Sequence, residues 1–322
     1  MSTRDEAAEV FLPGIDALKG ASGRAATATG ILSDLVASMR PRQWTKNALV
    51  FVAPAAAGVL VHRADLLHTL ATFGIFCAAA SGVYLVNDVT DAGADRNHPV
   101  KRHRPIARGA VSPRLAVAIA SGLIGGALAA AWFVARQDLV VLMAVYLVIS
   151  FAYTLRLKRE PVIELAAVAS GFLLRAVAGG VATHIPLSSW FVAVASFGAL
   201  FVVVGKRLGE YLRLGETAGQ HRDVLQVYTA PFLRSALTLT ASVTVTAYCL
   251  WAFDKVGLLS HAAHHYVWIQ LSVIPIILGV LHMLRLVDAG LVDAPEDLVF
   301  HDHLLQGLGA LWIGLFAIGI YG

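Results

Sequence analysis

The chain has 322 residues, of which 57% are hydrophobic and only 14% are charged, and its formal net charge at pH 7 is +4. A soluble globular protein carries about 25% charged residues, so this composition excludes that class and indicates an integral membrane protein. The first thirty residues show no basic, apolar and small-residue signal pattern, so we expect no cleaved signal peptide.

Nine apolar segments follow one another along the chain, and most approach the ~20 residues that a helix needs to cross ~30 Å of hydrocarbon. Because backbone groups cannot stay unsatisfied in a bilayer, each segment is predicted to be helical. Their approximate limits are residues 48–61, which is short for a span, 66–87, 113–135, 138–155, 162–181, 188–205, 232–253, 266–287 and 303–321. We therefore predict an all-α integral membrane protein with about nine transmembrane helices. Residues 1–35 are predicted to form an N-terminal tail, and residues 36–322 one transmembrane domain.

The lysines and arginines are concentrated before the first segment and in alternate connections between the segments. Cytoplasmic connections of membrane proteins carry an excess of these residues. With nine spans, this pattern places the N-terminus and all of the basic connections on the cytoplasmic side.

Basic and aromatic residues precede the first apolar segment in the stretch RPRQWTKN, which runs from Arg40 to Asn47. Lys46 is a candidate for binding an anionic substrate at the cytoplasmic mouth of the protein, together with Arg40. Trp44 is typical of the membrane interface, so a membrane-surface anchor is the alternative role of this stretch.

An acidic cluster follows the second apolar segment, in the stretch NDVTDAGADRNHPVKRHRPIARG from Asn87 to Gly109. If the helix continues past the membrane, spacings of three and four residues place the asparagine and the three aspartates on one face. Carboxylates so close together repel one another unless a cation binds, and ligands that are all oxygen suit Mg²⁺. We predict that Asp88, Asp91 and Asp95 are catalytic and bind Mg²⁺, with Asn87 beside the substrate. A solvated helix end is the alternative.

Basic side chains come directly after this acidic cluster, and we predict that they bind substrate phosphates, because ammonium and guanidinium groups bind phosphate directly. They include Lys101, Arg102, Arg104 and Arg108. Positive charge that serves only topology, or contact with anionic lipid headgroups, is the alternative.

Arg175 lies inside the fifth apolar segment, about thirteen residues beyond Val162, which is ~20 Å of helix at 1.5 Å per residue. This position is too deep for an ordinary snorkelling side chain, and intramembrane arginines usually face a cavity or a partner. We predict a substrate-binding role in a polar cavity, with hydrogen bonding to helix carbonyls as the alternative.

The pattern NDxxDxxxD followed by HPxKxxRPIAxG resembles the first aspartate-rich motif of the UbiA superfamily of intramembrane prenyltransferases. The resemblance implies a bundle of nine helices around a central cavity, with the motifs on the cytoplasmic side. In that superfamily the aspartates hold Mg²⁺ on a prenyl diphosphate. A second motif, usually DxxxD after the sixth helix, holds a second ion.

The chain departs from the superfamily at this second motif, where Lys206 and Arg207 stand in place of acids and Glu210 follows one turn later. A substrate with more phosphate than one diphosphate is implied, because cationic side chains bind phosphate without a metal. This departure, together with RPRQWTKN, GFLLRAVAGG and the run YTLRLKREPVIE that begins at Tyr153, resembles the decaprenyl-phosphate phosphoribosyltransferase branch. The resemblance covers roughly residues 36–321 and implies that Tyr153, Lys206, Arg207 and Glu210 bind substrate.

Enzymes of that branch transfer the 5-phosphoribosyl group of phosphoribosyl diphosphate to a polyprenyl phosphate, for bacterial cell-envelope arabinan. The resemblance therefore implies an Mg²⁺-dependent pentosyltransferase of the bacterial inner membrane, with an active site that faces the cytoplasm and no nucleic-acid partner. A prenyltransferase that attaches a polyprenyl diphosphate chain to an aromatic quinone or haem precursor is the close alternative, which two acidic motifs would favour.

A transporter is less favoured, because the charges gather at helix ends on one side. Helix faces rich in small residues would permit a homo-oligomer.

Overall fold

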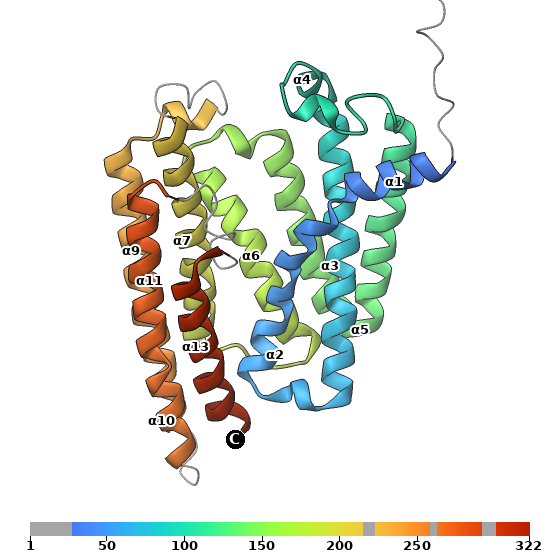
Figure 1. Cartoon of the computed structure of the whole chain (residues 1–322). Helices are drawn as coiled ribbons and strands as arrows, with labels where there is room; N and C mark the ends of the chain where they lie inside the picture. The colour runs from blue at the N-terminus through green and yellow to red at the C-terminus, as the bar shows by residue number, and fades with distance from the viewer. Residues whose placement is uncertain (1–27, 215–222, 258–262, 292–300) are drawn as a thin grey trace, which may run out of the picture.

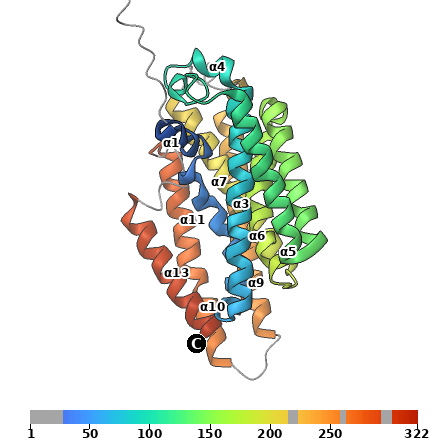
Figure 2. The same cartoon turned by 90° about the vertical axis from the view of Figure 1, so that its right-hand side faces the viewer.

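The computed structural model describes residues 28–214, 223–257, 263–291 and 301–322. In this part of the chain all regular structure is helical, which confirms the predicted all-α fold, and the long helices run side by side in one bundle (Figure 1). Helix α1 (Ala28–Met39) lies across one end of the bundle, the end at which the short helix α4 (Ala92–Arg96) also lies (Figure 2). Residues 1–27 of the predicted tail are outside the described part, and the division at residue 35 stays a prediction.

Seven helices of the described ranges are long and apolar enough to cross a membrane. Six of them are α3 (Arg63–Thr90), α5 (Pro113–Leu155), α6 (Ile163–Ala182), α7 (Ser189–Leu214), α9 (Ala230–Gly257) and α13 (His303–Tyr321). The seventh span, Val267–Asp288, consists of the end of α10 (Ala263–Leu271) and the whole of α11 (Val273–Asp288). Pro275, the third residue of α11, has no backbone N–H and cannot donate to the carbonyl of Leu271, the last residue of α10. This missing hydrogen bond accounts for the break between the two helices.

Helix α5 contains two of the predicted segments, because the chain reverses inside it at Ala135 and Arg136. The backbone of Arg136 has φ 48° and ψ −135°, which is not helical. A straight helix of 43 residues would be ~65 Å long. Lys158, three residues past the end of α5, nevertheless lies 3.0 Å from Asp91, just after α3, so both halves of α5 span the same layer.

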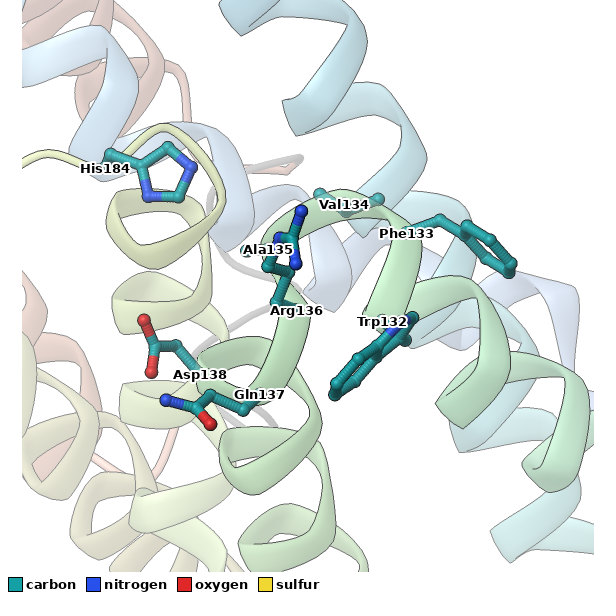
Figure 3. A pocket seen from close by; sticks show the side chains of 8 residues that line it. All are labelled: Trp132, Phe133, Val134, Ala135, Arg136, Gln137, Asp138 and His184. Atoms are coloured by element: carbon teal, nitrogen blue, oxygen red, sulfur yellow. The ribbon is translucent and has the colours of Figure 1, made fainter.

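The turn of α5 carries side chains that are typical of a membrane interface. Trp132 and Phe133 precede the turn and are exposed, as interfacial aromatic anchors are. A hollow of about 700 Å³ lies beside the turn, and its lining includes Arg136, Asp138 and, from the connection after α6, His184 (Figure 3). The turn is at the opposite end of the bundle from α4, so this hollow is separate from the predicted site.

The first predicted segment, residues 48–61, does not form one continuous helix. It is divided among the 3₁₀ helix η2 (Pro41–Phe51), the short α2 (Val52–Ala56) and the 3₁₀ turn η3 (Val59–Val61). Gly58, with φ 75°, turns the chain between the last two. The predicted count of nine spans is therefore not confirmed, and it stays a prediction together with the cytoplasmic N-terminus.

Helix α6 joins two hydrophobic cores. Leu165 and Ala169, in its first half, pack with α7, α9 and α11. Ala178, in its second half, packs with α3, α5 and Val50 of η2. Because α6 belongs to both cores, the space where it meets η2, α3, α5 and α7 lies at the centre of the bundle.

Candidate active site

A pocket of about 320 Å³ occupies this central space between η2, α3, α5, α6 and α7. Four of the side chains that line it are cationic, and several others carry hydroxyl or amide groups. The polar lining consists of Arg40, Lys46, Tyr84, Asn87, Tyr146, Ser150, Tyr153, Thr154, Arg175 and Lys206. The apolar lining consists of Ala80, Val83, Ala167, Val168, Gly171 and Phe172. Such a pocket suits a ligand with several negative charges and an apolar part.

The acidic cluster lies at the edge of this pocket, where α3 ends. The backbone N–H of Asp91 donates to Asn87 O (2.9 Å) and that of Asp95 to Asp91 O (2.9 Å), so the helical path continues into α4. Asp88 and Asp95 are buried, at 2% and 4% exposure. The continued helix thus brings the predicted acids together, and Asn87 lines the pocket.

Basic side chains balance each acid of the cluster. Arg40 pairs with Asp88. The Nη1 atom of Arg104 lies 2.7 Å from Asp95 Oδ2 and 3.3 Å from Asp88 Oδ1. Asp91, which is partly exposed, pairs with Lys158. The repulsion expected among these carboxylates is therefore relieved by side chains of the protein itself.

This acidic cluster also offers oxygen ligands that fit Mg²⁺. Carboxylate oxygens of Asp88 and Asp95 converge on one nitrogen of Arg104, which is a position suited to a cation. Mg²⁺ in proteins is commonly held by one or two carboxylates, with water and substrate oxygens in its other positions. Among the described residues, no group of three or more His, Cys, Asp or Glu side chains could hold a metal ion. The arrangement therefore fits an ion that is shared with a bound substrate better than a closed protein cage.

Arg175 is buried at 8% exposure and also lines the pocket. Its Nε donates to Asn47 Oδ1 (2.7 Å), its Nη2 to the Tyr146 hydroxyl (3.0 Å) and its Nη1 to the carbonyl of Gly171. The guanidinium lies 4.9 Å from the centre of the Tyr146 ring, a cation–π distance. Both roles considered for this intramembrane arginine, a cavity wall and a hydrogen bond to a helix carbonyl, are compatible with its position.

Lys206 and Arg207, which are neighbours on α7, have different surroundings. Lys206 lines the pocket that Asn87 and Tyr153 also line, so the end of α3 and the second half of α7 face one space. Arg207 is not among the lining residues and is 3% exposed. Its guanidinium is paired instead with carboxylates of Glu164 and Glu210. Of this predicted pair, the structure brings only Lys206 to the pocket.

The four predicted phosphate ligands that follow the acidic cluster are absent from the pocket lining, and one of them, Arg104, pairs with that cluster instead. Arg108 pairs with Asp34 of α1 at 2.5 Å. Arg102 donates from Nε to the His103 ring (3.3 Å), and the side chain of Lys101 is only partly buried. Their role in binding phosphate stays a prediction.

The sequence did not reveal several residues that complete the site. Lys158, the partner of Asp91, and Asn47, the partner of Arg175, are in the runs YTLRLKREPVIE and RPRQWTKN, but neither stood out there. Tyr84 and Tyr146, which also line the pocket, could have been found from helical spacing. Tyr84 is four residues before Asp88 and Tyr146 is seven before Tyr153, so each lies on the same helix face as a predicted site residue.

The fold and the pocket define a multi-pass, all-helical membrane protein with a central cation-lined pocket beside an acidic helix end. The chain belongs to the UbiA prenyltransferase family, which it matches over residues 48–305. This assignment confirms the predicted superfamily and a membrane-embedded transferase.

Similar proteins of known name extend this result. The chain is 40% identical over 298 residues to the decaprenyl-phosphate phosphoribosyltransferase of Mycolicibacterium smegmatis, covering 90% of this chain and 93% of the relative. It is 43% identical over 287 residues to the protein of the same name from Mycobacterium tuberculosis, covering 88% and 93%. The predicted resemblance to that branch is thereby confirmed.

Solved structures support the fold. A UbiA homolog from Archaeoglobus fulgidus bound to DMAPP and Mg²⁺ matches with a TM-score of 0.65 at 19% identity, covering 89% of this chain and 97% of that one. A digeranylgeranylglyceryl phosphate synthase structure matches with a TM-score of 0.65 at 15% identity, covering 90% and 98%.

Proposed function

We propose that this protein transfers the 5-phosphoribosyl group of phosphoribosyl diphosphate to a polyprenyl phosphate such as decaprenyl phosphate, and releases diphosphate. The reaction would take place at the cytoplasmic face of the bacterial inner membrane and supply a precursor of cell-envelope arabinan. The observation that carries this proposal is the convergence of Arg40, Lys46, Arg175 and Lys206 on one pocket beside the acidic end of α3. The donor has a diphosphate at C1 and a phosphate at C5, so it needs cationic groups at both ends.

The chemistry follows from these charges. The bond between C1 and the diphosphate oxygen breaks, the diphosphate takes the electron pair, and a phosphate oxygen of the lipid forms the new bond to C1. Cationic side chains fixed around the leaving group stabilise the negative charge that develops on it. The acceptor phosphate is largely ionised at neutral pH, so the reaction needs no general base.

One or two of the carboxylates of Asp88, Asp91 and Asp95, together with oxygens of the substrate, would hold Mg²⁺, which supplies charge neutralisation on the diphosphate. Arg40 and Arg104 already balance Asp88 in this structure, and Arg40 also lines the pocket that would receive the leaving group. The apolar side of the pocket, which includes Val83, Val168 and Phe172, provides a surface for the first isoprene units of the acceptor.

A transfer assay tests the proposed function. Purified protein in nanodiscs is incubated with Mg²⁺, phosphoribosyl diphosphate labelled in the ribose, and decaprenyl phosphate. We expect label in the lipid fraction and release of diphosphate. A parallel reaction contains a polyprenyl diphosphate and 4-hydroxybenzoate. Prenylation of the aromatic acid without ribosyl transfer would replace our proposal with the other activity considered for this family.

Lys206→Gln is expected to raise the KM for phosphoribosyl diphosphate ~10- to 100-fold, because a hydrogen bond to a charged group contributes ~1.5–3 kcal/mol. The KM for decaprenyl phosphate should change much less. The control is Arg234→Gln, which removes a half-exposed cation paired with Asp288 outside the pocket lining. Equal losses for both substrates in Lys206→Gln would indicate that Lys206 only supports the structure.

A further inference from the structure

Arg207 connects two helices through carboxylates. Its Nε lies 2.7 Å from Glu164 Oε1 and its Nη2 lies 2.8 Å from Glu164 Oε2, which is a bidentate pair between α7 and α6. Its Nη1 lies 2.9 Å from Glu210 Oε2, one turn further along α7. We call Glu164, Arg207 and Glu210 the acid–arginine clamp. Two carboxylates thus converge on one guanidinium.

The acid–arginine clamp is costly to bury. Glu164 has 0% exposure and Arg207 has 3%, so both charges are removed from water. Replacing a buried ion pair by well-packed apolar residues is often neutral or stabilising, and α6 and α7 already share an apolar core. Stability alone therefore does not account for three ionised side chains in this place. A role in fixing the positions of side chains accounts for them, because a bidentate pair holds a guanidinium and a carboxylate in one plane.

The acid–arginine clamp lies directly behind the wall of the pocket. Lys206 precedes Arg207 in the chain and lines the pocket, and α6, the helix that carries Glu164, also contributes Val168 and Gly171 to the lining. On the other side, the hydroxyl of Tyr228 accepts a hydrogen bond from the N–H of Val162 (2.8 Å). Burial raises the pKa of Tyr228, so its phenol stays neutral beside Glu164.

We propose, building on the phosphoribosyltransferase function, that Arg207 is a positioning residue. It acts through Glu164 and Glu210 to hold Lys206 against the phosphates of the donor, and it does not bind phosphate itself. The guanidinium acts as an internal cation between two carboxylates. The acid–arginine clamp thereby sets affinity for the soluble donor, while the lipid acceptor is bound without it.

A double-mutant cycle separates this role from direct phosphate binding. Glu164→Gln removes the carboxylate but leaves the Arg207 cation in place. If Arg207 bound the donor directly, this variant would keep the donor KM or lower it. A positioning role predicts that Glu164→Gln and Arg207→Gln each raise the donor KM ~10-fold, and that the double variant is no worse than either single one.

Three further measurements complete the test. In the Glu164→Gln background, Lys206→Gln should cost less donor affinity than in the wild type, because Lys206 is already misplaced. Glu210→Gln, at a more exposed position, is the milder variant to use if Glu164→Gln does not fold. The matched control is the exposed Arg234–Asp288 pair (2.7 Å), whose variants should leave both KM values unchanged.

The outcomes separate the two proposals. If the wild type transfers no ribosyl group to lipid, the proposed function fails, whatever the variants do. If the wild type is active and the two substitutions add, or Glu164→Gln binds donor as well as the wild type, the positioning role of Arg207 is wrong and the function stands. Non-additive loss of donor affinity with an unchanged acceptor KM supports the acid–arginine clamp.

Discussion

Replacing Asp91 with asparagine is expected to lower turnover ~100-fold or more while the protein stays folded, because a metal ligand at a developing charge contributes several kcal/mol. Asp91 and its partner Lys158 are both partly exposed, which makes the structural cost small. Exposed ion pairs contribute about 0–1 kcal/mol to stability. Asp91→Asn therefore separates catalysis from folding better than a substitution at a buried acid.

The companion variant Asp88→Asn should lose turnover as well, but with a lower Tm. Asp88 is 2% exposed and is paired with both Arg40 and Arg104, and breaking a buried pair from one side costs ~3–5 kcal/mol. The control is Asp288→Asn, the same chemical change at an exposed carboxylate. Turnover and thermal unfolding are measured over a range of Mg²⁺ concentrations. Undiminished Mg²⁺-dependent activity in Asp91→Asn and Asp88→Asn would refute the metal assignment.

The long helices could be predicted because their signal is local. A run of about twenty apolar residues bounded by charge has few alternatives in a membrane, so α3, α6 and α13 begin and end within a few residues of the predicted limits. The reversal in α5 was also visible, since Arg136 and Asp138 interrupt an otherwise apolar run. The division of the first segment into short helices could not be predicted in this way, because it depends on how η2 packs against α6 and not only on hydropathy.

The acidic cluster was predictable for the same reason: helical spacing fixes which of its side chains share a face. The partners of those acids were not, because Lys158 and Arg40 reach them from other parts of the chain. Glu164 is the clearest case. Glu164 lies eleven residues before Arg175, on nearly the same face of α6, but its carboxylate pairs with Arg207, 43 residues away. Contacts between helices depend on their rotation and depth in the bundle, which a single sequence does not encode locally.

Convergence of distant segments on one pocket is the condition on which the proposed function depends. Asn87 and Lys206 come from different helices and line the same space, so one small molecule can meet the acidic end of α3 and the cation of α7 together. Had these residues been at opposite ends of the bundle, neither the metal nor the cations could act on the same donor. Charge patterns identified the two groups, and packing brings them together.

Gly179→Ala is expected to be among the most destabilising single-methyl changes in the described part of the protein. A Cβ at this position would lie 1.9 Å from the carbonyl oxygen of Val50 and 2.9 Å from Pro54 Cδ. The first neighbour is backbone and cannot rotate away, so α6 and η2 must separate. Overpacking usually costs ~1–3 kcal/mol and occasionally more, and contact with a fixed carbonyl favours the upper end of this range.

The same substitution should also impair donor binding, because η2 carries Lys46 into the pocket and Asn47 onto Arg175. Thermal unfolding in detergent and the donor KM are measured together. The matched control is Gly74→Ala in α3, where no atom lies within 4 Å of the added carbon, and where alanine is the better helix former by about 1 kcal/mol. If Gly179→Ala were as stable as the wild type, η2 would not pack against α6 at this position. The wall of the pocket that η2 forms would then differ from the one described.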